Sequence, residues 1–136
     1  MNALDFLLQI RALERTIWRL TMRRDELQAC LLPVAIRYDL DRVQTTPEDK
    51  IATLASAVAD LDVQLRELRT QKADLVIEVA DAIDRLEDDR EKTILCAYYV
   101  GRVSMEGIAD KIGYSLSHCY RLRRQGVQHL GEILER

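Results

Sequence analysis

The feature that most constrains the fold of this chain is the spacing of its apolar residues before residue 90. Large apolar side chains recur at alternating steps of four and three residues, first at Phe6, Ile10, Leu13, Ile17, Leu20, Leu27 and Leu31. A second series of the same kind consists of Ile51, Leu54, Val58, Leu61, Leu65, Leu68, Leu75, Val79 and Leu86. This heptad spacing puts each series on one face of a helix, and that face must be buried against another helix. The pattern therefore predicts two long helices.

A proline and a dense helix-start signal set the predicted limits of these helices. Pro33 removes an amide donor and restricts the residue before it, so we expect the first helix to run from about Asn2 to Leu32. A connector over 34–45 would follow. Thr46 then offers a hydroxyl cap, and Pro47 stands at the first helical position before two acids. A second helix of about 40 residues, roughly 60 Å long, is expected from there.

The two apolar seams could pair within one chain or between two chains. The short connector favours an antiparallel hairpin within the chain. The additional apolar residues Val76, Ile77 and Ile83 indicate a second buried face, which would serve a homodimer. Arg24 and Lys72 interrupt the seams and either fix their register or extend to solvent at the edge. We expect a hairpin that also helps the chain to form a homodimer.

A helix-turn-helix pattern follows at residues 104–124. The residues expected to join its two helices are Ile108, Ala109, Ile112, Cys119 and Leu122. Gly113 can take the positive φ that the turn needs, and Ser115 is placed to cap the second helix. Upstream, Glu87-Asp88-Asp89 predicts a break and a cap for a helix over 90–100, which Gly101 ends. Ser104, with Glu106 or Gly107, is expected to begin the next helix. The predicted fold is all-α: a hairpin or coiled-coil arm at 1–88, with a break near 33–46, and a helix-turn-helix domain at 89–136.

The charges are distributed unevenly along the chain. Its net charge is −3, yet residues 39–91 contain seven basic and fifteen acidic groups, whereas residues 92–136 contain seven basic and four acidic ones. An acidic middle repels DNA and a basic C-terminal part attracts it. Arg11, Arg15, Arg19 and Arg23 also form a stripe near the N-terminus, which we interpret as a solvated face paired with carboxylates rather than a phosphate-binding surface.

The second helix of the helix-turn-helix carries the candidate DNA contacts. It bears three arginines and has no acidic residue between Ser115 and Gly131. A cationic helix of this kind enters the DNA major groove, where arginine bonds guanine and residues of the first turn contact base edges. The predicted DNA-binding residues are Ser115, Ser117, His118, Tyr120, Arg121, Arg123, Arg124, Arg102 and Lys111. Arg102, Lys111 and Arg123 are expected to bind phosphates rather than bases.

The segment REKTILCAYYVGRVSMEGIADKIGYSLSHCYRLRRQGVQHL resembles the promoter-binding region 4 of the sigma-70 family. It is also similar to phage and prophage regulators with a sigma-region-4-like C-terminus, the ArpU/RinA-like late-operon proteins. The motifs that carry this second resemblance are Tyr98-Tyr99-Val100, Ile108-Ala109, Gly113-Tyr114-Ser115, Tyr120-Arg121-Leu122 and the junction at Val43 to Ile51. The resemblance implies control of phage genes through double-stranded DNA, with RNA polymerase as a further partner. A promoter-melting region is missing, so we expect the protein to recruit, redirect or block polymerase.

Three functions fit these features. The first is a sequence-specific transcription regulator, whose binding to duplex DNA would depend on salt and on Arg121. The second is a DNA-packaging component similar to phage small terminase subunits, which also join a helix-turn-helix to a coiled-coil arm. The third is a protein that binds RNA polymerase without contacting DNA. The cationic helix favours the first function.

We expect no enzyme activity, no cofactor and no metal ion. The sequence has no glycine-rich phosphate loop, metal-spaced cluster or nucleophile motif. His118 and Cys119 project about 100° apart on a helix and cannot readily share a ligand. His129 is a lone histidine that we expect to be exposed.

A cytoplasmic location is expected from the cysteines and from the apolar runs. Cys30, Cys96 and Cys119 are odd in number and far apart, which suits a reducing compartment and small core residues. The chain starts without a basic leader, and it contains no run of about 18 apolar residues that would span a membrane.

Overall fold

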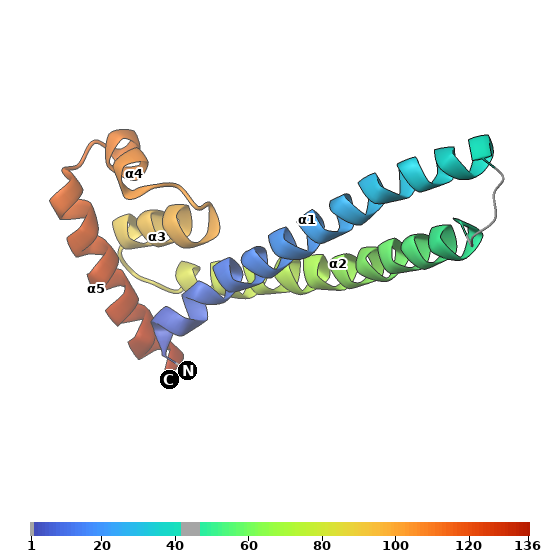
Figure 1. The fold of residues 1–136 in the computed structure, drawn as a ribbon. Coiled ribbons are helices and arrows are strands. Elements are labelled where there is room, and N and C mark those ends of the chain that lie inside the picture. The colour runs from blue at the N-terminus through green and yellow to red at the C-terminus, as the bar shows by residue number, and fades with distance from the viewer. Residues whose placement is uncertain (1, 42–46) are drawn as a thin grey trace. The chain divides into compact units, whose positions relative to one another are not determined.

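The computed structural model describes the backbone of residues 2–41 and 47–136, and the side chains of residues 2–31 and 49–136 (Figure 1). Every element within these ranges is a helix, so the all-α prediction is confirmed. The elements are α1 (Ala3–Asp41), α2 (Pro47–Asp84), α3 (Asp89–Leu95), the π-helical turn η1 (Cys96–Val100), α4 (Met105–Ile112) and α5 (Leu116–Leu134).

The predicted end of the first helix at Leu32 is wrong. Helix α1 continues through Pro33 to Asp41. An interior proline costs a helix about 3 kcal/mol, because it removes one hydrogen bond and crowds the preceding turn. That local cost does not end α1, since every other residue of a helix this long still adds its own hydrogen bond. The rest of the predicted connector and the Thr46 cap lie outside the described residues, and α2 begins at Pro47 as predicted.

The packing divides the chain into two compact units. The C-terminal unit comprises Met1–Ala12 and Lys72–Arg136, and the hairpin unit comprises Leu13–Gln71. This division differs from a boundary at residue 88, because the first turns of α1 and the last turns of α2 pack with the C-terminal helices. That the arm and the helix-turn-helix act as separate domains stays a prediction.

The hairpin unit consists of antiparallel stretches of α1 and α2 (Figure 1). Val58, Leu61 and Leu65 are buried, so the heptad seam of α2 faces its partner within the same chain. At the polar position of the α1 seam, Arg24 Nε donates to Asp62 Oδ1 at 2.9 Å. This hydrogen bond raises the pKa of Arg24. The seams therefore pair as the predicted hairpin, and Arg24 joins its two helices.

Two apolar clusters hold the C-terminal unit together. The larger joins α1, α2, α3, η1 and α5 through Ala3, Phe6, Leu7, Ile10, Val79, Ala82, Ile83, Leu86, Leu95, Tyr99 and Leu130. The smaller joins α3, α4 and α5 through Ile94, Met105, Ile108, Ala109, Cys119 and Leu122. The five predicted contact residues of the helix-turn-helix include four members of this smaller cluster, and the fifth, Ile112, packs against it.

The predicted helix over 90–100 contains two different helical forms. Asp88 caps α3, and its side chain accepts a hydrogen bond from the amide of Arg90 at 2.8 Å. The chain then widens into η1, where the amide of Gly101 donates to the carbonyl of Cys96 at 2.9 Å. This turn carries Tyr99 into the larger cluster and leaves Tyr98 half-buried beside it.

Only one of the three cysteines fits the predicted core role. Cys119 is buried, and burial raises the pKa of its thiol. Cys30 and Cys96 are exposed, so the prediction was wrong for them. Cys30 stands one position before the seam residue Leu31, which turns its side chain about 100° away from the seam.

Candidate nucleic-acid interface

Three local hydrogen-bonding signals set the ends of α4 and α5. The hydroxyl of Ser104 accepts from the amide of Gly107 at 3.1 Å and begins α4. Gly113 ends α4 with a φ of 79°, which glycine adopts without steric cost. The hydroxyl of Ser115 accepts from the amide of His118 at 3.2 Å and begins α5. Each of these predicted caps and turns is confirmed.

One face of α5 packs tightly against the rest of the C-terminal unit. Cys119, Leu122, Gly126 and Leu130 are buried on it. A Cβ added at Gly126 would lie 3.2 Å from Leu95 Cδ1, so α3 and α5 are in close contact there. This contact fixes which face of α5 points outward.

The outward face of α5 carries a polar and basic stripe. Its members follow one another at steps of four, three and four residues, which keeps them on one side of the helix, and all are exposed: Ser117, Arg121, Arg124 and Gln128. We call these four residues the outer stripe. No acidic residue occurs on α5 before Glu132. The stripe therefore offers hydrogen-bond donors and positive charge without an opposing carboxylate.

Arg121 is held in place by its neighbours in the first turns of α5. Its Nη2 donates to Nδ1 of His118. The ring of His118 meets the ring of Tyr114 edge-on, with centroids 5.0 Å apart. His118, a predicted base contact, is half-buried and here supports Arg121. Ser117 lies one turn before Arg121 on the outer stripe.

Arg123 and Tyr120 are predicted DNA contacts that face an aromatic cluster. The guanidinium carbon of Arg123 lies 4.6 Å from the ring centre of Tyr98 and 5.1 Å from that of Tyr120. Arg11 of α1 also lies over Tyr98, at 4.2 Å, and donates to its carbonyl at 3.0 Å. The Arg11 hydrogen bond to the phenol lowers the pKa of Tyr98. These cation–π contacts occupy Arg123, and phosphate binding by Arg123 stays a prediction.

The remaining predicted contacts lie outside the outer stripe. Arg102 follows η1 with a φ of 56°, an uncommon value for a residue with a side chain, and it is exposed. Lys111 is exposed in the last turn of α4. The hydroxyl of Ser115 serves as the cap of α5.

The structure adds residues to the candidate site that the sequence interpretation missed. Gln128 completes the outer stripe, and Gln125 is exposed one position after Arg124. Gln128 could have been found from its spacing of four residues from Arg124. Arg11 was assigned to a solvated stripe, but it binds Tyr98, and no local pattern indicates that contact.

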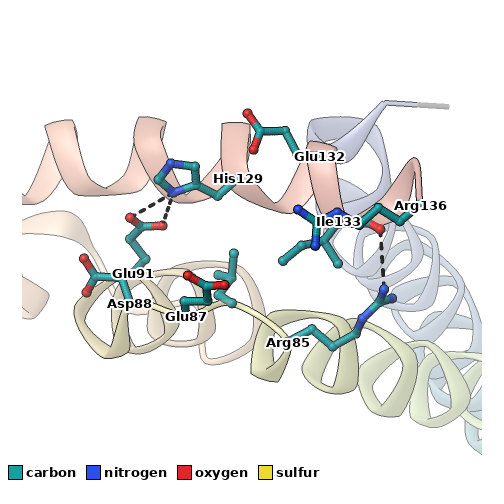
Figure 2. Close-up of a pocket in the computed structure, with 9 residues that line it drawn as sticks. Arg85, Glu87, Asp88, Glu91, His129, Glu132, Ile133 and Arg136 are labelled. Carbon is teal, nitrogen blue, oxygen red and sulfur yellow. Dashed lines mark hydrogen bonds and ion pairs between the residues drawn. The ribbon is translucent and has the colours of Figure 1, made fainter.

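A second polar feature lies beside the last turns of α5 (Figure 2). It is an open cleft of about 260 Å³ in the C-terminal unit. Nδ1 of His129 lies 2.7 Å from Oε1 of Glu91, a carboxylate that is 2% exposed. This hydrogen bond raises the pKa of His129, and the charges of Glu91, Glu132 and Asp88 add to the effect. His129 is exposed as predicted, but it is not a lone side chain, because its bond to Glu91 joins α5 to α3.

A second contact at the edge of the cleft joins α5 to the turn that follows α2. Arg85 Nη2 donates to the carbonyl of Ile133 at 3.4 Å (Figure 2). The cleft lining contains charges of both signs, since Arg85 and Arg136 face Glu87, Asp88, Glu91 and Glu132. The cleft is therefore a junction between helices, and the outer stripe is the better candidate for binding nucleic acid.

Within the described part of the chain, neither a metal-binding cluster nor a membrane-spanning helix is found. Among the side chains of residues 2–31 and 49–136, no group of three or more His, Cys, Asp or Glu could hold a metal ion. Within the same ranges, each helix is too short or too polar to cross a membrane.

Comparison with known proteins places the chain in a family. Residues 43–131, more than half of the 136, match the model of a family described as "Protein of unknown function (DUF1492)". The chain belongs to the DUF1492 family. Neither a curated protein nor a solved structure matches it. The matched region of this DUF1492 protein includes α3, α4 and the outer stripe.

Proposed function

We propose that this DUF1492 protein is a phage-type transcription regulator of the cytoplasm, which binds duplex DNA by placing α5 in the major groove. The observation that supports the proposal is the outer stripe. Ser117, Arg121, Arg124 and Gln128 project from one side of a helix that is fixed from behind by α3 and α4. A helix presented in this way by a helix-turn-helix frame suits the width of the major groove.

The chemistry of the outer stripe matches what DNA displays. Arginine bonds O6 and N7 of guanine as a bidentate pair, and glutamine does the same with N6 and N7 of adenine. Arg121 is the proposed base contact because His118 holds its guanidinium near the start of α5. Arg124 and Gln128 continue the stripe along the helix and are exposed. The absence of carboxylates on α5 before Glu132 avoids repulsion from the phosphates.

The finer part of the proposal is kinship with the ArpU/RinA-like late-operon regulators, with RNA polymerase as a second partner. The resemblance of the Tyr98-Tyr99-Val100 and Gly113-Tyr114-Ser115 motifs supports it. In the structure, Gly113 and Ser115 form the turn and cap that a helix-turn-helix needs. The proposed role is binding, without catalysis.

The direct test is a binding titration of the full chain with a mixed-sequence duplex at several salt concentrations. We expect affinity to fall steeply with salt, and we expect Arg121→Ala and Arg124→Ala each to weaken binding about fivefold or more. Arg69→Ala is the matched control, because Arg69 is an exposed arginine on α2. Circular dichroism of each variant would show that the helices are retained. The proposal fails if the wild type does not bind, or if Arg69→Ala weakens binding as much as Arg121→Ala does.

A further inference from the structure

Leu116 is an apolar residue at the start of α5 that the core of the C-terminal unit does not use. It directly follows the capping residue Ser115, and its side chain is 38% exposed. The apolar residues that α5 packs inward, Cys119, Leu122 and Leu130, are each 2% exposed or less. Leu116 belongs to neither apolar cluster of the C-terminal unit. Its methyl groups are therefore available for contact with another molecule.

Two other exposed apolar residues of the helix-turn-helix have neighbours that account for their positions. The ring of Tyr114 meets the ring of His118 edge-on, with centroids 5.0 Å apart. Val103 lies against the start of α4, where a Cβ added at Gly107 would be 3.1 Å from its Cγ1. Leu116 differs from both because it stands on α5 itself, in the first turn of the helix that we propose enters the groove.

Leu116 lies at the margin of the outer stripe. It precedes Ser117 by one position, which turns its side chain about 100° around the helix. The Cα–Cβ bonds of a helix tilt toward its N-terminus, so a side chain at the first helical position extends toward that end of α5. Residues in the first turn of a recognition helix are the ones that contact base edges. Leu116 is therefore placed to reach the same groove as Ser117 and Arg121.

The chemistry around Leu116 suits an apolar contact with DNA. No acidic residue occurs from Lys111 to Gly131, and the nearest acid in the sequence is Asp110 of α4, six residues before Leu116. The major groove displays hydrogen-bond donors and acceptors, and it displays one apolar group, the 5-methyl of thymine. An exposed leucine beside basic residues matches this methyl group, because apolar side chains distinguish thymine by contact with it.

We propose that Leu116 recognises a thymine through its 5-methyl group, within about three base pairs of the guanine that Arg121 bonds. The inference rests on the proposed function, because it requires α5 to lie in the major groove. Leu116 and Arg121 are five positions apart, which is a rise of about 7.5 Å along the helix, and successive base pairs are about 3.4 Å apart. Together the two contacts select a guanine with a thymine close to it.

Replacing thymine by uracil removes the methyl group and keeps the base pair. The full chain first selects a duplex from a random pool near physiological salt, and Arg121→Ala identifies the guanine by the position at which its enrichment is lost. Each thymine near that guanine is then replaced in turn by deoxyuridine. We expect one replacement to weaken wild-type binding about fourfold, the factor for one lost methyl contact. The same replacement should change the affinity of Leu116→Ala by less than about 1.5-fold.

Two further variants serve as controls. Leu134→Ala is matched to Leu116→Ala, because Leu134 is also 38% exposed on α5 but stands at the other end of the helix. It should respond to uracil like the wild type. Leu116→Met keeps a large apolar side chain and should keep most of the response. Circular dichroism of each variant would show that the helices are retained.

The outcomes separate this inference from the proposed function. An equal effect of uracil on the wild type and Leu116→Ala would overturn the inference alone, provided that binding still depends on Arg121. The same holds for a selected site with no thymine within about three base pairs of the guanine, or for one in which no such thymine responds to uracil. No enrichment by the wild type would overturn the inference and the proposed function together.

Discussion

Arg121 and Arg123 stand two positions apart on α5 and have different surroundings. Arg121 lies on the exposed outer stripe and bonds the half-buried ring of His118. Arg123 is half-buried and lies over the rings of Tyr98 and Tyr120. We therefore expect Arg121 to serve binding and Arg123 to serve stability, although both are arginines on the same helix.

Truncation of each arginine should separate these two roles. Arg123→Ala removes two cation–π contacts, so we expect the free energy of unfolding to fall by about 1 kcal/mol. Arg121→Ala removes an exposed contact and should change it by less than about 0.5 kcal/mol. Urea denaturation followed by circular dichroism measures both values. Equal losses in the two variants would show that Arg123 is not held by the aromatic rings.

The pair of Glu91 and His129 should make stability depend on pH. The pKa of His129 is raised in the folded protein, chiefly by its hydrogen bond to Glu91. A histidine with a raised folded pKa stabilises the fold below its unfolded pKa of about 6.5, and this stabilisation is lost as the pH rises through the folded value. We expect the stability difference between the wild type and His129→Gln to be larger near about pH 6 than near about pH 9. A difference that is the same at both pH values would contradict the role of the charged histidine.

The residues that the sequence predicted correctly act on backbone groups close to them in the sequence. Ser104, Gly113 and Ser115 each cap or turn the chain within three residues, so local patterns were enough to find them. Contacts between distant elements could not be found in this way. Glu91 and His129 are 38 positions apart, and their pairing depends on how α3 crosses α5.

The helices show where local signals compete with packing. Pro33 signals a helix end, yet α1 continues to Asp41 because one missing hydrogen bond is a small part of a long helix. The π-helical turn at η1 has no recognised sequence signal, and it arises where Tyr99 packs into the larger cluster. The sequence predicted that the helices exist, but it did not predict that α1 ends at Asp41 or that the helix after α3 becomes π-helical.

The crossing of α3 and α5 allows a matched pair of substitutions. At Gly126 a new methyl group would lie 3.2 Å from buried Leu95 and 3.3 Å from Cβ of Glu91, so we expect Gly126→Ala to destabilise the fold by about 1–3 kcal/mol. At Gly131 the nearest atom is Cβ of Ala3 at 3.7 Å, an ordinary contact. Gly131→Ala should therefore stabilise α5 by up to about 1 kcal/mol. Thermal unfolding measures both, and a Gly126→Ala variant as stable as Gly131→Ala would show that the crossing has room.

At the scale of the whole molecule, charge and packing indicate different roles for the hairpin unit and the C-terminal unit. The buried seam of Val58, Leu61 and Leu65 closes the hairpin unit, and the two apolar clusters of the C-terminal unit hold α5 with its outer stripe exposed. Residues 39–91 are strongly acidic, so we expect only the C-terminal helices to approach DNA. The all-α class and the hairpin followed from heptad spacing. The division into two units did not, because it depends on contacts between both ends of the chain.

The central claim is that the outer stripe recognises a DNA sequence, and selection of bound duplexes from a random pool tests it most directly. The full chain is used near physiological salt, with Arg121→Ala and Arg69→Ala in parallel. We predict that the wild type and Arg69→Ala enrich the same sequence, whereas Arg121→Ala loses the enrichment at one or more positions. A palindrome would fit a two-fold dimer, and a single asymmetric site would fit action beside polymerase. No enrichment by the wild type, or an identical sequence from Arg121→Ala, would contradict the account.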